Sequence, residues 1–373
     1  MTAKPNTNKR VVDQSIFLKL RSTETFWRDH YIWLKEQGYL LRPRYCPDWV
    51  PSWKDQFDPD LTRYEDSYSS RRRNILDATR ISDSQMVTLK CISTQVHPFE
   101  VEITRFFSTE PISSHPRNHC ISLHSVLNVP DVENTVILVL PFLREYKRPR
   151  FKSVGEAVEF FRQIFEGLQF IHQCHVAHRD CMDLNIMMDP KPMFPDLYHP
   201  IATRRKKDIS GRAKYYTRTA RPVKYYIIDF GISRKYSPDD PSPLEDPIVG
   251  GDKTVPEFQN SDAACNPFPT DIYYLGNLIR KDFLEKTKGV EFMEPLVADM
   301  VQADPSKRPT IDEVVERFDK ISRSLHWWTL RSRLVELQEG DYIFDPIIRP
   351  IHHFFRTVAH VLTFKSAVPT PRI

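Results

Sequence analysis

The chain has 373 residues, of which 40% are hydrophobic, and its formal net charge is +4 at pH 7. This length allows one two-lobed domain with tails or two ordinary domains. The small net charge excludes a polycation that coats nucleic acid or anionic membranes as a whole. Six cysteines occur without a C-x-x-C pair, so neither a zinc ribbon nor a disulfide framework is expected.

The start of the chain and its hydropathy predict a soluble intracellular protein, cytoplasmic or nuclear. Residues 1–10 are polar and basic, with no apolar core behind them of the kind a signal peptide has. No run approaches the roughly 18 apolar residues that a membrane span needs. We therefore expect no transmembrane segment.

Residues 1–73 are expected to form an N-terminal extension. Within it, 24–37 has a helical pattern, because Phe26, Trp27 and Leu34 can share one apolar face and Gly38 follows as a stop. A stretch rich in Pro and Trp at 43–53 and a polar, charged segment up to residue 73 then indicate a linker.

The next part of the chain, 74–143, is rich in predicted strands. Apolar runs at 87–92, 120–127 and 136–143 predict three of them, with a helix at 98–107. From residue 144 the pattern becomes helical. Ser153 with Glu156, and Thr310 with Glu313, form capping-box patterns, and a further helix is indicated at 271–283. Strands first and helices later predict an α+β fold with a small antiparallel lobe and a larger helical lobe.

A chemical motif follows the helix that ends near Cys174. His178-Arg179-Asp180 is followed by Asn185, and an apolar run at 225–228 leads into Asp229-Phe230-Gly231. Phosphoryl transfer needs a carboxylate that orients the attacking hydroxyl and accepts its proton, and oxygen ligands that hold magnesium. Asp180, Asn185 and Asp229 have the required chemistry, whereas a solvated turn is the alternative interpretation.

In this order the two segments resemble the catalytic and metal-binding loops of eukaryotic-type protein kinases. The resemblance covers 74–321, with a small lobe at about 74–143 and a large lobe at about 144–321. It implies that Asp180 is the catalytic base and that Asn185 and Asp229 bind Mg²⁺. It also implies ATP and an unidentified protein, with a Ser or Thr hydroxyl, as substrates.

The resemblance extends to the residues expected to bind the nucleotide. Lys90 ends a run similar to the family's V-A-I-K, which implies a contact with the ATP phosphates. Glu100 is the expected partner of Lys90, since Ile103 and Phe107 would then face the core, and Glu102 is the alternative. In the hinge-like run 140–143, Pro141 would offer its carbonyl and Leu143 its N–H to the adenine, with Ala78 assigned to the same site.

Three further positions resemble structural elements of protein kinases. Glu257 stands in a Val-Pro-Glu segment similar to A-P-E, Arg308 stands where its partner is found, and Asp271 begins a run similar to the central helix. Small-molecule kinases share the catalytic loop but normally lack this set. An ion pair between Glu257 and Arg308 would therefore favour the protein-kinase type.

The sequence also departs from the family. No glycine occurs between Gly38 and Gly155, so the glycine-rich phosphate loop is missing. The serines and arginines of 69–73 could replace it, or they could be a solvated basic run. Met182 stands where serine/threonine kinases have a lysine, and 250–254 does not match a usual acceptor-site signature. The alternative function is a pseudokinase that acts as a binding scaffold.

Two segments have no assigned role in phosphoryl transfer. An insertion at about 190–224 carries nine cations and one acid in its later half, which indicates a solvated loop or a docking arm for an acidic partner. The tail, 322–373, has apolar helical faces that could pack on the large lobe or contact a partner or membrane surface. Together with the Trp-rich segment, it resembles fungal kinase-like proteins of the mushroom-forming lineages.

Overall fold

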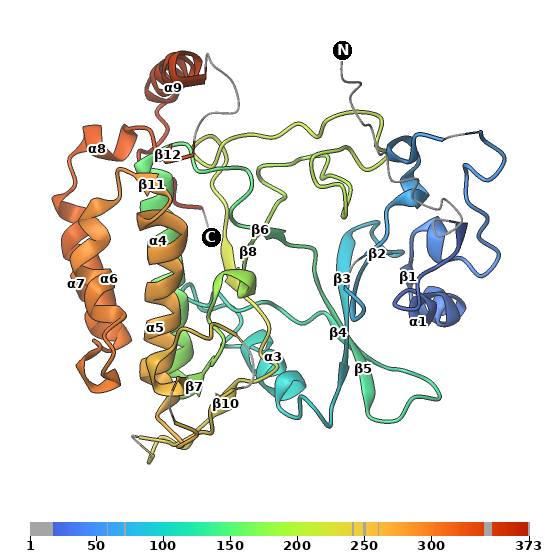
Figure 1. Ribbon diagram of the computed structural model, residues 1–373, viewed down its shortest axis with the longest axis horizontal. Helices are drawn as coiled ribbons and strands as arrows, with labels where there is room; N and C mark the ends of the chain where they lie inside the picture. Colours follow the sequence, from blue (N-terminus) through green and yellow to red (C-terminus); the bar gives the residue numbers. More distant parts are fainter. Residues whose placement is uncertain are drawn as a thin grey trace, which may run out of the picture. The chain divides into compact units, whose positions relative to one another are not determined.

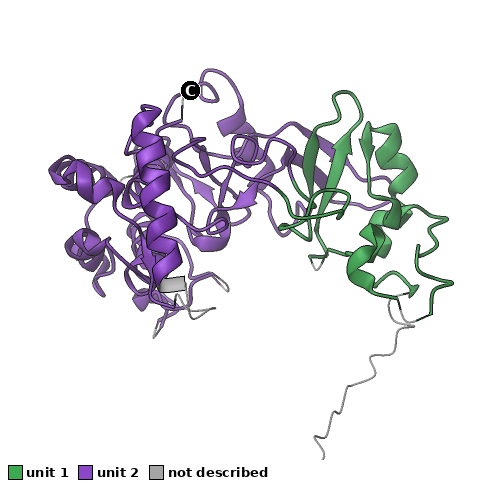
Figure 2. Cartoon of the chain, turned by 90° about the horizontal axis from the view of Figure 1, so that it is seen from above, with its two compact units in different colours: residues 1–89, 198–213 green, residues 90–197, 214–373 purple. Residues whose placement is uncertain are grey.

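The computed structural model describes residues 18–57, 59–70, 72–240, 242–248, 251–259, 261–338 and 345–371 (Figure 1). The expectation for 1–10 and the position of Gly250 lie outside the described residues. By compactness the chain divides into unit 1, with 1–89 and 198–213, and unit 2, with 90–197 and 214–373 (Figure 2). Each unit is described separately below.

Unit 1 is built from two short helices, a strand pair and several single turns of 3₁₀-helix. Helices α1 (Thr25–Asp29) and α2 (Tyr31–Glu36) replace the single helix expected at 24–37, because the backbone leaves the helical region at His30, with φ −101° and ψ 10°. Strand β1 (Tyr39–Leu40) pairs antiparallel with β2 (Ile75–Arg80), and β3 (Met86–Ser93) begins in this unit. The 3₁₀ turns cover Pro43–Tyr45, Leu61–Arg63 and Glu65–Ser67.

The segment expected to be a linker is packed within unit 1. Buried Arg44 donates two hydrogen bonds to Glu24, at 2.7 and 3.0 Å, and one to the carbonyl of Asp66 at 2.8 Å. The Asp66 carboxylate accepts in turn from Trp49 Nε1 at 2.9 Å. Because paired charges are the usual way to bury arginine and glutamate, this polar network gives the Trp-rich segment a defined structure.

Part of the basic insertion also belongs to unit 1. His199 is buried, with Nε2 3.1 Å from the Glu65 carboxylate and its ring against Tyr68. Beyond it, Arg205 and Arg212 form an antiparallel bridge that closes a hairpin-like turn. The turn carries the exposed cations Arg204, Arg205, Lys206, Lys207 and Arg212.

The strands of unit 2 form small antiparallel groups. β4 (Ser125–Asn128) pairs with β5 (Thr135–Pro141), and β6 (Arg144–Glu145), β8 (Ile186–Met188) and β9 (Tyr225–Ile227) form a three-stranded sheet in that order. β7 (Val176–Ala177) pairs with β10 (Arg234–Lys235), and β11 (Thr287–Lys288) with β12 (Val335–Glu336). The strand expected at 120–127 is shorter than predicted, because the chain near Cys120 and Ile121 bonds to Ile227 instead.

Unit 2 contains the longest helices of the described chain (Figure 1). The helices of unit 2 are α3 (Glu100–Ser108), α4 (Val154–Gln173), α5 (Pro267–Ile279), α6 (Glu294–Met300), α7 (Ile311–Ser324), α8 (Trp327–Arg331) and α9 (Asp345–Leu362), with a π-helical turn at Arg280–Leu284 and short 3₁₀ turns at Asp183–Asn185, Pro256–Phe258, Glu291–Met293 and Pro305–Lys307. Helix α4 packs against α7 and α8, and α5 packs against α6. Strands and helices are both abundant, so the described chain has an α+β fold.

Both predicted capping signals lie at helix starts. Ser153 accepts a hydrogen bond from the Glu156 N–H at the start of α4, and Thr310 with Glu313 forms the full reciprocal capping box of α7. The α4 core is aromatic, with Phe160 and Phe161 both packed against Phe283. Within the described ranges, none of the helices has the length and apolar composition that crossing a bilayer requires.

Candidate functional site

The segment around His178 is held by Asp271, which lies on α5. Asn266 caps this helix by accepting from the Phe268 N–H, so the Asp271 carboxylate sits in its first turns, fully buried. Its two oxygens accept from the backbone N–H of Arg179 at 2.7 Å and of His178 at 2.8 Å. Arg179 has φ 68°, an uncommon conformation that these two hydrogen bonds stabilise.

His178 has a structural role in this segment. Its Nδ1 accepts from the Asp180 N–H at 3.2 Å, so Nε2 carries the proton and donates to the Ile228 carbonyl at 3.0 Å. Complete burial lowers the pKa of His178, which keeps the ring neutral. The ring packs edge-on against Phe230, which stacks on Phe107 of α3. The His178 ring therefore joins the segment at 178–185 to the segment at 228–231, by one hydrogen bond and one ring contact.

Asp180 and Asn185 are joined side chain to side chain. The Asn185 amide donates to Asp180 Oδ2 at 2.7 Å and to the Asp180 carbonyl at 2.9 Å. The other carboxylate oxygen, Oδ1, is buried without a hydrogen-bond partner among the described residues. Burial, together with the nearby carboxylates of Asp229 and Asp271, raises the pKa of Asp180 to about 7. An aspartate in this state can gain or lose a proton near neutral pH.

Lys90 lies between two carboxylates. Its Nζ is 2.5 Å from Glu100 Oε1 on α3 and 2.8 Å from Asp229 Oδ1. Lys90 and Glu100 are buried, whereas the Asp229 side chain is 41% exposed. The pair that the sequence predicted is thus present in the structure, and Glu102 is not in it.

The charges of this cluster support one another. Burial alone would lower the pKa of Lys90, but Glu100 and Asp229 outweigh that effect and raise it. Burial would likewise raise the pKa of Asp229, but the Lys90 ammonium outweighs it, so the net shift is downward. Burial raises the pKa of Glu100 beyond what Lys90 offsets. Lys90 and Asp229 are therefore held as an ammonium and a carboxylate.

The turn at Asp229 depends on the following glycine. Asp229 has φ 68°, and its Oδ1 accepts from the Gly231 N–H at 3.3 Å. A Cβ on Gly231 would lie 3.0 Å from His97 Nδ1 and 3.2 Å from Glu100 Oε2. A larger residue would therefore press on the group that holds Lys90.

A second glycine lies against Asp180. Gly251 has φ +65°, and a Cβ built on it would be 2.7 Å from Asp180 Oδ1. This close approach belongs to a segment whose next residue, Asp252, bonds to Asn277 and Lys281 of the helical core. The signal was visible in the sequence only as a Gly-Gly pair, and its position at the carboxylate was not predicted.

Glu257 and Arg308 form a bidentate ion pair. Arg308 donates to the two carboxylate oxygens of Glu257 at 2.7 and 2.6 Å, and Thr270 donates to the same carboxylate at 2.8 Å. The pairing expected from the sequence is present, and the Arg308 side chain is fully buried. Burial would raise the pKa of Glu257, but the hydrogen bonds and charge of Arg308 outweigh it and lower it.

The residues expected to contact adenine lie in both units. Pro141 is the last residue of β5 in unit 2, and Leu143 stands between β5 and β6; both are half-buried. Ala78 is buried in β2 of unit 1.

The described residues contain no cluster of three or more His, Cys, Asp or Glu side chains spaced to hold a metal ion. Asp229 and Asn185 are nevertheless suited to Mg²⁺, which takes oxygen ligands and keeps several waters or phosphate oxygens of its own. Asn185 uses its nitrogen toward Asp180, which leaves its Oδ1 as the atom for a cation. The Asp229 side chain, which is 41% exposed and whose pKa is lowered, would be the second ligand of such a cation.

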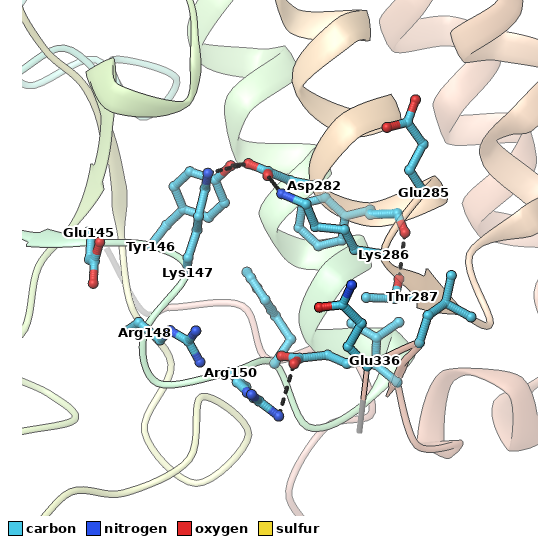
Figure 3. A pocket seen from close by; sticks show the side chains of 15 residues that line it. Glu145, Tyr146, Lys147, Arg148, Arg150, Asp282, Glu285, Lys286, Thr287 and Glu336 are labelled. Atoms are coloured by element: carbon cyan, nitrogen blue, oxygen red, sulfur yellow. Dashed lines mark hydrogen bonds and ion pairs between the residues drawn. The ribbon is translucent and has the colours of Figure 1, made fainter. Parts of the chain in front are cut away.

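Lys147 connects this site to a polar recess of about 680 Å³ (Figure 3). Its ammonium pairs with Asp183, inside the 3₁₀ turn that ends at Asn185, and with Asp282 at 2.7 Å. Figure 3 shows Lys147 and Lys286 directed at Asp282, and Arg150 paired with Glu336. Sequence reasoning missed Lys147, since a lone lysine in a polar stretch carries no signal.

A scan against protein-family models returns no match to this chain, and a search of curated proteins returns none. The site is therefore interpreted from its own geometry and chemistry.

Proposed function

We propose that this chain is an ATP- and magnesium-dependent protein kinase, which transfers the γ-phosphate of ATP to a serine or threonine hydroxyl of another protein. The observation that carries the proposal is the contact of Lys90 with both Glu100 and Asp229. Lys90 and Glu100 come from a strand and from the helix that follows it, and Asp229 comes from a loop 139 residues after Lys90. Their cluster offers an ammonium to phosphate oxygens and a carboxylate to a cation, as phosphoryl transfer requires.

Asp180 is the proposed base. As the hydroxyl oxygen bonds to the γ-phosphorus, its proton passes to Asp180, and the bond to the β,γ-bridging oxygen breaks to release ADP. A pKa of about 7 suits a base that works near neutral pH. Asn185 donates to Oδ2 at 2.7 Å, which orients the carboxylate, and Oδ1 has no hydrogen-bond partner among the described residues.

The remaining roles concern the nucleotide. Lys90 would contact the α- and β-phosphates, and Asp229 with Asn185 would hold Mg²⁺, which when bound neutralises charge on the phosphates. Pro141 O and Leu143 N would hold the adenine. In this proposal the α+β chain is a two-lobed protein-kinase-like fold.

The buried pair of Glu257 and Arg308 supports a protein kinase over a small-molecule phosphotransferase. The bidentate contact at 2.6 and 2.7 Å ties the segment after Asp180 to the helical core of unit 2. The carboxylate of Asp271, which accepts from two backbone N–H groups, also supports the protein-kinase type. A phosphotransferase for small molecules has no protein substrate to dock, so neither contact would be expected in it.

A second candidate function is a pseudokinase scaffold. Strands β1 and β2 pair with each other, and residues 41–74 connect them. This connection is much longer than the short hairpin of a glycine-rich loop. No glycine occurs in that segment, and Met182 cannot donate a hydrogen bond to phosphate. Both features favour weak or absent transfer.

Transfer of radiolabelled phosphate from ATP to a generic basic protein tests the proposal. Wild type should label the substrate, and Asp180→Asn, Lys90→Met and Asp229→Asn should each reduce the rate by at least about 100-fold. Asp208→Asn, which changes an exposed aspartate in the insertion, is the matched control and should keep the wild-type rate. Equal labelling by wild type and Asp180→Asn would exclude the kinase.

Nucleotide binding separates the two candidates. A ligand that binds only the folded state raises the melting temperature, so millimolar ATP with Mg²⁺ should stabilise wild type and have less effect on Lys90→Met. Stabilisation without transfer would favour the scaffold. If ATP neither stabilises the protein nor is used for transfer, a nucleotide site around Lys90 is excluded.

A further inference from the structure

Helix α9 carries an exposed apolar stripe along its whole length. Its members recur at helical spacing and are between 39% and 72% exposed: Ile347, Ile348, Ile351, Phe354, Phe355, Val358, Val361 and Leu362. Phe364 follows, almost fully exposed. Monomeric proteins rarely expose apolar patches of this extent unless the patch is a binding surface.

The polar side of α9 is the side that contacts the rest of unit 2. His353 Nε2 donates to the Arg331 carbonyl of α8 at 3.0 Å, and Arg356 donates to Nδ1 of the same histidine at 3.0 Å. Burial lowers the pKa of His353, consistent with a neutral ring that accepts from Arg356. The helix is therefore attached through its polar residues, with its apolar residues outward.

The chain after α9 fixes this orientation. Arg331 donates to the Lys365 carbonyl, and Thr370 donates to Glu159 of α4 at 3.1 Å. Gly155, in the first turn of α4, leaves space for the Ala367 carbonyl, which would lie only 2.0 Å from a Cβ at that position. Contacts of the helix and of the chain after it thus oppose a rotation that would bury the stripe.

Charge and shape indicate what covers the stripe. From 346 to the last residue the sequence has four cations, Arg349, Arg356, Lys365 and Arg372, and no Asp or Glu. Two copies joined along α9 would bring these tails together with like charge, whereas an anionic surface would attract them. The stripe is also wider than the two-in-seven seam of a coiled coil, and Pro350 lies inside the helix, a residue that helix interiors disfavour.

We propose that α9 is an interfacial helix that lies on anionic lipid bilayers, with its apolar stripe among the acyl chains and its polar side toward unit 2. Isoleucine, phenylalanine and leucine on one side and arginine and histidine on the other are the composition of such helices. The kinase proposal is not needed for this inference, since none of the residues in the candidate site contributes to it.

Sedimentation of the full chain with vesicles tests the proposal. We expect binding to vesicles of phosphatidylcholine with about one-third phosphatidylserine, and at least tenfold weaker binding to phosphatidylcholine alone. The double variant Phe354→Glu with Phe355→Glu should lose at least about tenfold in binding to the anionic vesicles. Phe57→Glu, which makes the same change at a fully exposed phenylalanine of unit 1, should bind as wild type.

Two further measurements keep the test decisive. Lys365→Glu should weaken binding to anionic vesicles and leave circular dichroism unchanged. Analytical ultracentrifugation without lipid should show a monomer; a dimer that dissociates in the double variant would assign the stripe to a second copy and overturn the proposal. Equal binding to both vesicle types, or binding by the double variant at the wild-type level, would overturn it too.

Discussion

The side-chain amide of Asn185 donates to Oδ2 of Asp180 at 2.7 Å, while Oδ1 of the same carboxylate is buried without a hydrogen-bond partner among the described residues. One oxygen is oriented and the other lacks the solvation that a negative charge needs. Burial and the neighbouring carboxylates of Asp229 and Asp271 accordingly raise the pKa of Asp180 to about 7. Ionisation of Asp180 therefore costs the folded state free energy above neutral pH.

This cost predicts a pH-dependent effect of Asp180→Asn on stability. An aspartate in an unfolded chain has a pKa of about 3.9, so the contribution of Asp180 to stability is fully present below about pH 4 and is lost as the pH rises through about 7. Relative to wild type, Asp180→Asn should gain about 1–3 kcal/mol between pH 5 and pH 8. Thermal unfolding of both proteins at the two pH values measures it.

The control for this measurement is Asp262→Asn, an exposed aspartate outside the site. It should follow wild type at both pH values. A gain for Asp180→Asn that is the same at pH 5 and pH 8 would contradict the raised pKa of Asp180.

Local signals in the sequence predicted the parts of this structure that depend on neighbours in the chain. The capping box of Thr310 and Glu313 predicted the start of α7, and helical spacing selected Glu100 over Glu102 as the partner of Lys90. The paired motifs predicted that Asp180 and Asn185 would act together, and they are 2.7 Å apart.

Contacts between distant segments could not be predicted in this way. The burial of Arg44 depends on the Glu24 carboxylate and the Asp66 carbonyl, and nothing in the sequence signals either contact, so local patterns predict a linker there. The strand expected near Cys120 is shortened because Ile227, over a hundred residues later, offers a competing partner. Pairing of this kind is decided by the folded chain as a whole.

The buried pair of Arg308 and Glu257 predicts that Arg308→Lys is strongly destabilising. Lysine cannot make the bidentate contact, and it also leaves the Gln302 and Pro269 carbonyls, which Arg308 now serves at 2.9 and 3.0 Å, without a donor. We expect a loss of about 3 kcal/mol in the free energy of unfolding, measured by chemical denaturation.

An exposed pair provides the comparison. Arg317 contacts Asp299 at 2.6 Å, but the two side chains are 37% and 43% exposed, so Arg317→Lys should cost no more than about 0.5 kcal/mol. If the two substitutions cost the same, the Arg308 pair is not buried as described.

We predict that the position and the raised pKa of the Asp180 carboxylate depend on Gly251. An alanine there would place a methyl group 2.7 Å from Asp180 Oδ1, and it would also occupy φ +65°, where a side chain costs about 1 kcal/mol. Gly38→Ala is the matched control, because Gly38 has φ +90° and no atom lies within 4 Å of its Cβ position. Both variants should lose about 1 kcal/mol of stability from the backbone.

The variants should differ in the chemistry of the site. Only Gly251→Ala should change the dependence of stability on pH between 5 and 8, because only it displaces the Asp180 carboxylate. Under the kinase proposal it should also lower phosphate transfer at least about tenfold. A Gly251→Ala protein with the pH dependence of wild type would show that the segment does not contact Asp180.

Arg218 is a buried, structural cation of the basic insertion, in contrast to the cations on the surface of the insertion. It is 2% exposed, donates to the carbonyls of Tyr146 at 2.5 Å and Pro149 at 2.8 Å, and lies over the Phe151 ring at 4.0 Å. Arg218→Met would leave both carbonyls buried without a donor, and should cost about 3 kcal/mol in the free energy of unfolding.

Arg212→Met, at an exposed position of the hairpin-like turn, should change stability by less than about 0.5 kcal/mol. If an acidic partner binds the insertion, Arg212→Met should weaken that binding in a titration with an acidic peptide while the fold is retained. Near-equal stability losses for the two variants would mean that the insertion has no buried anchor and that its cations act as one solvated group.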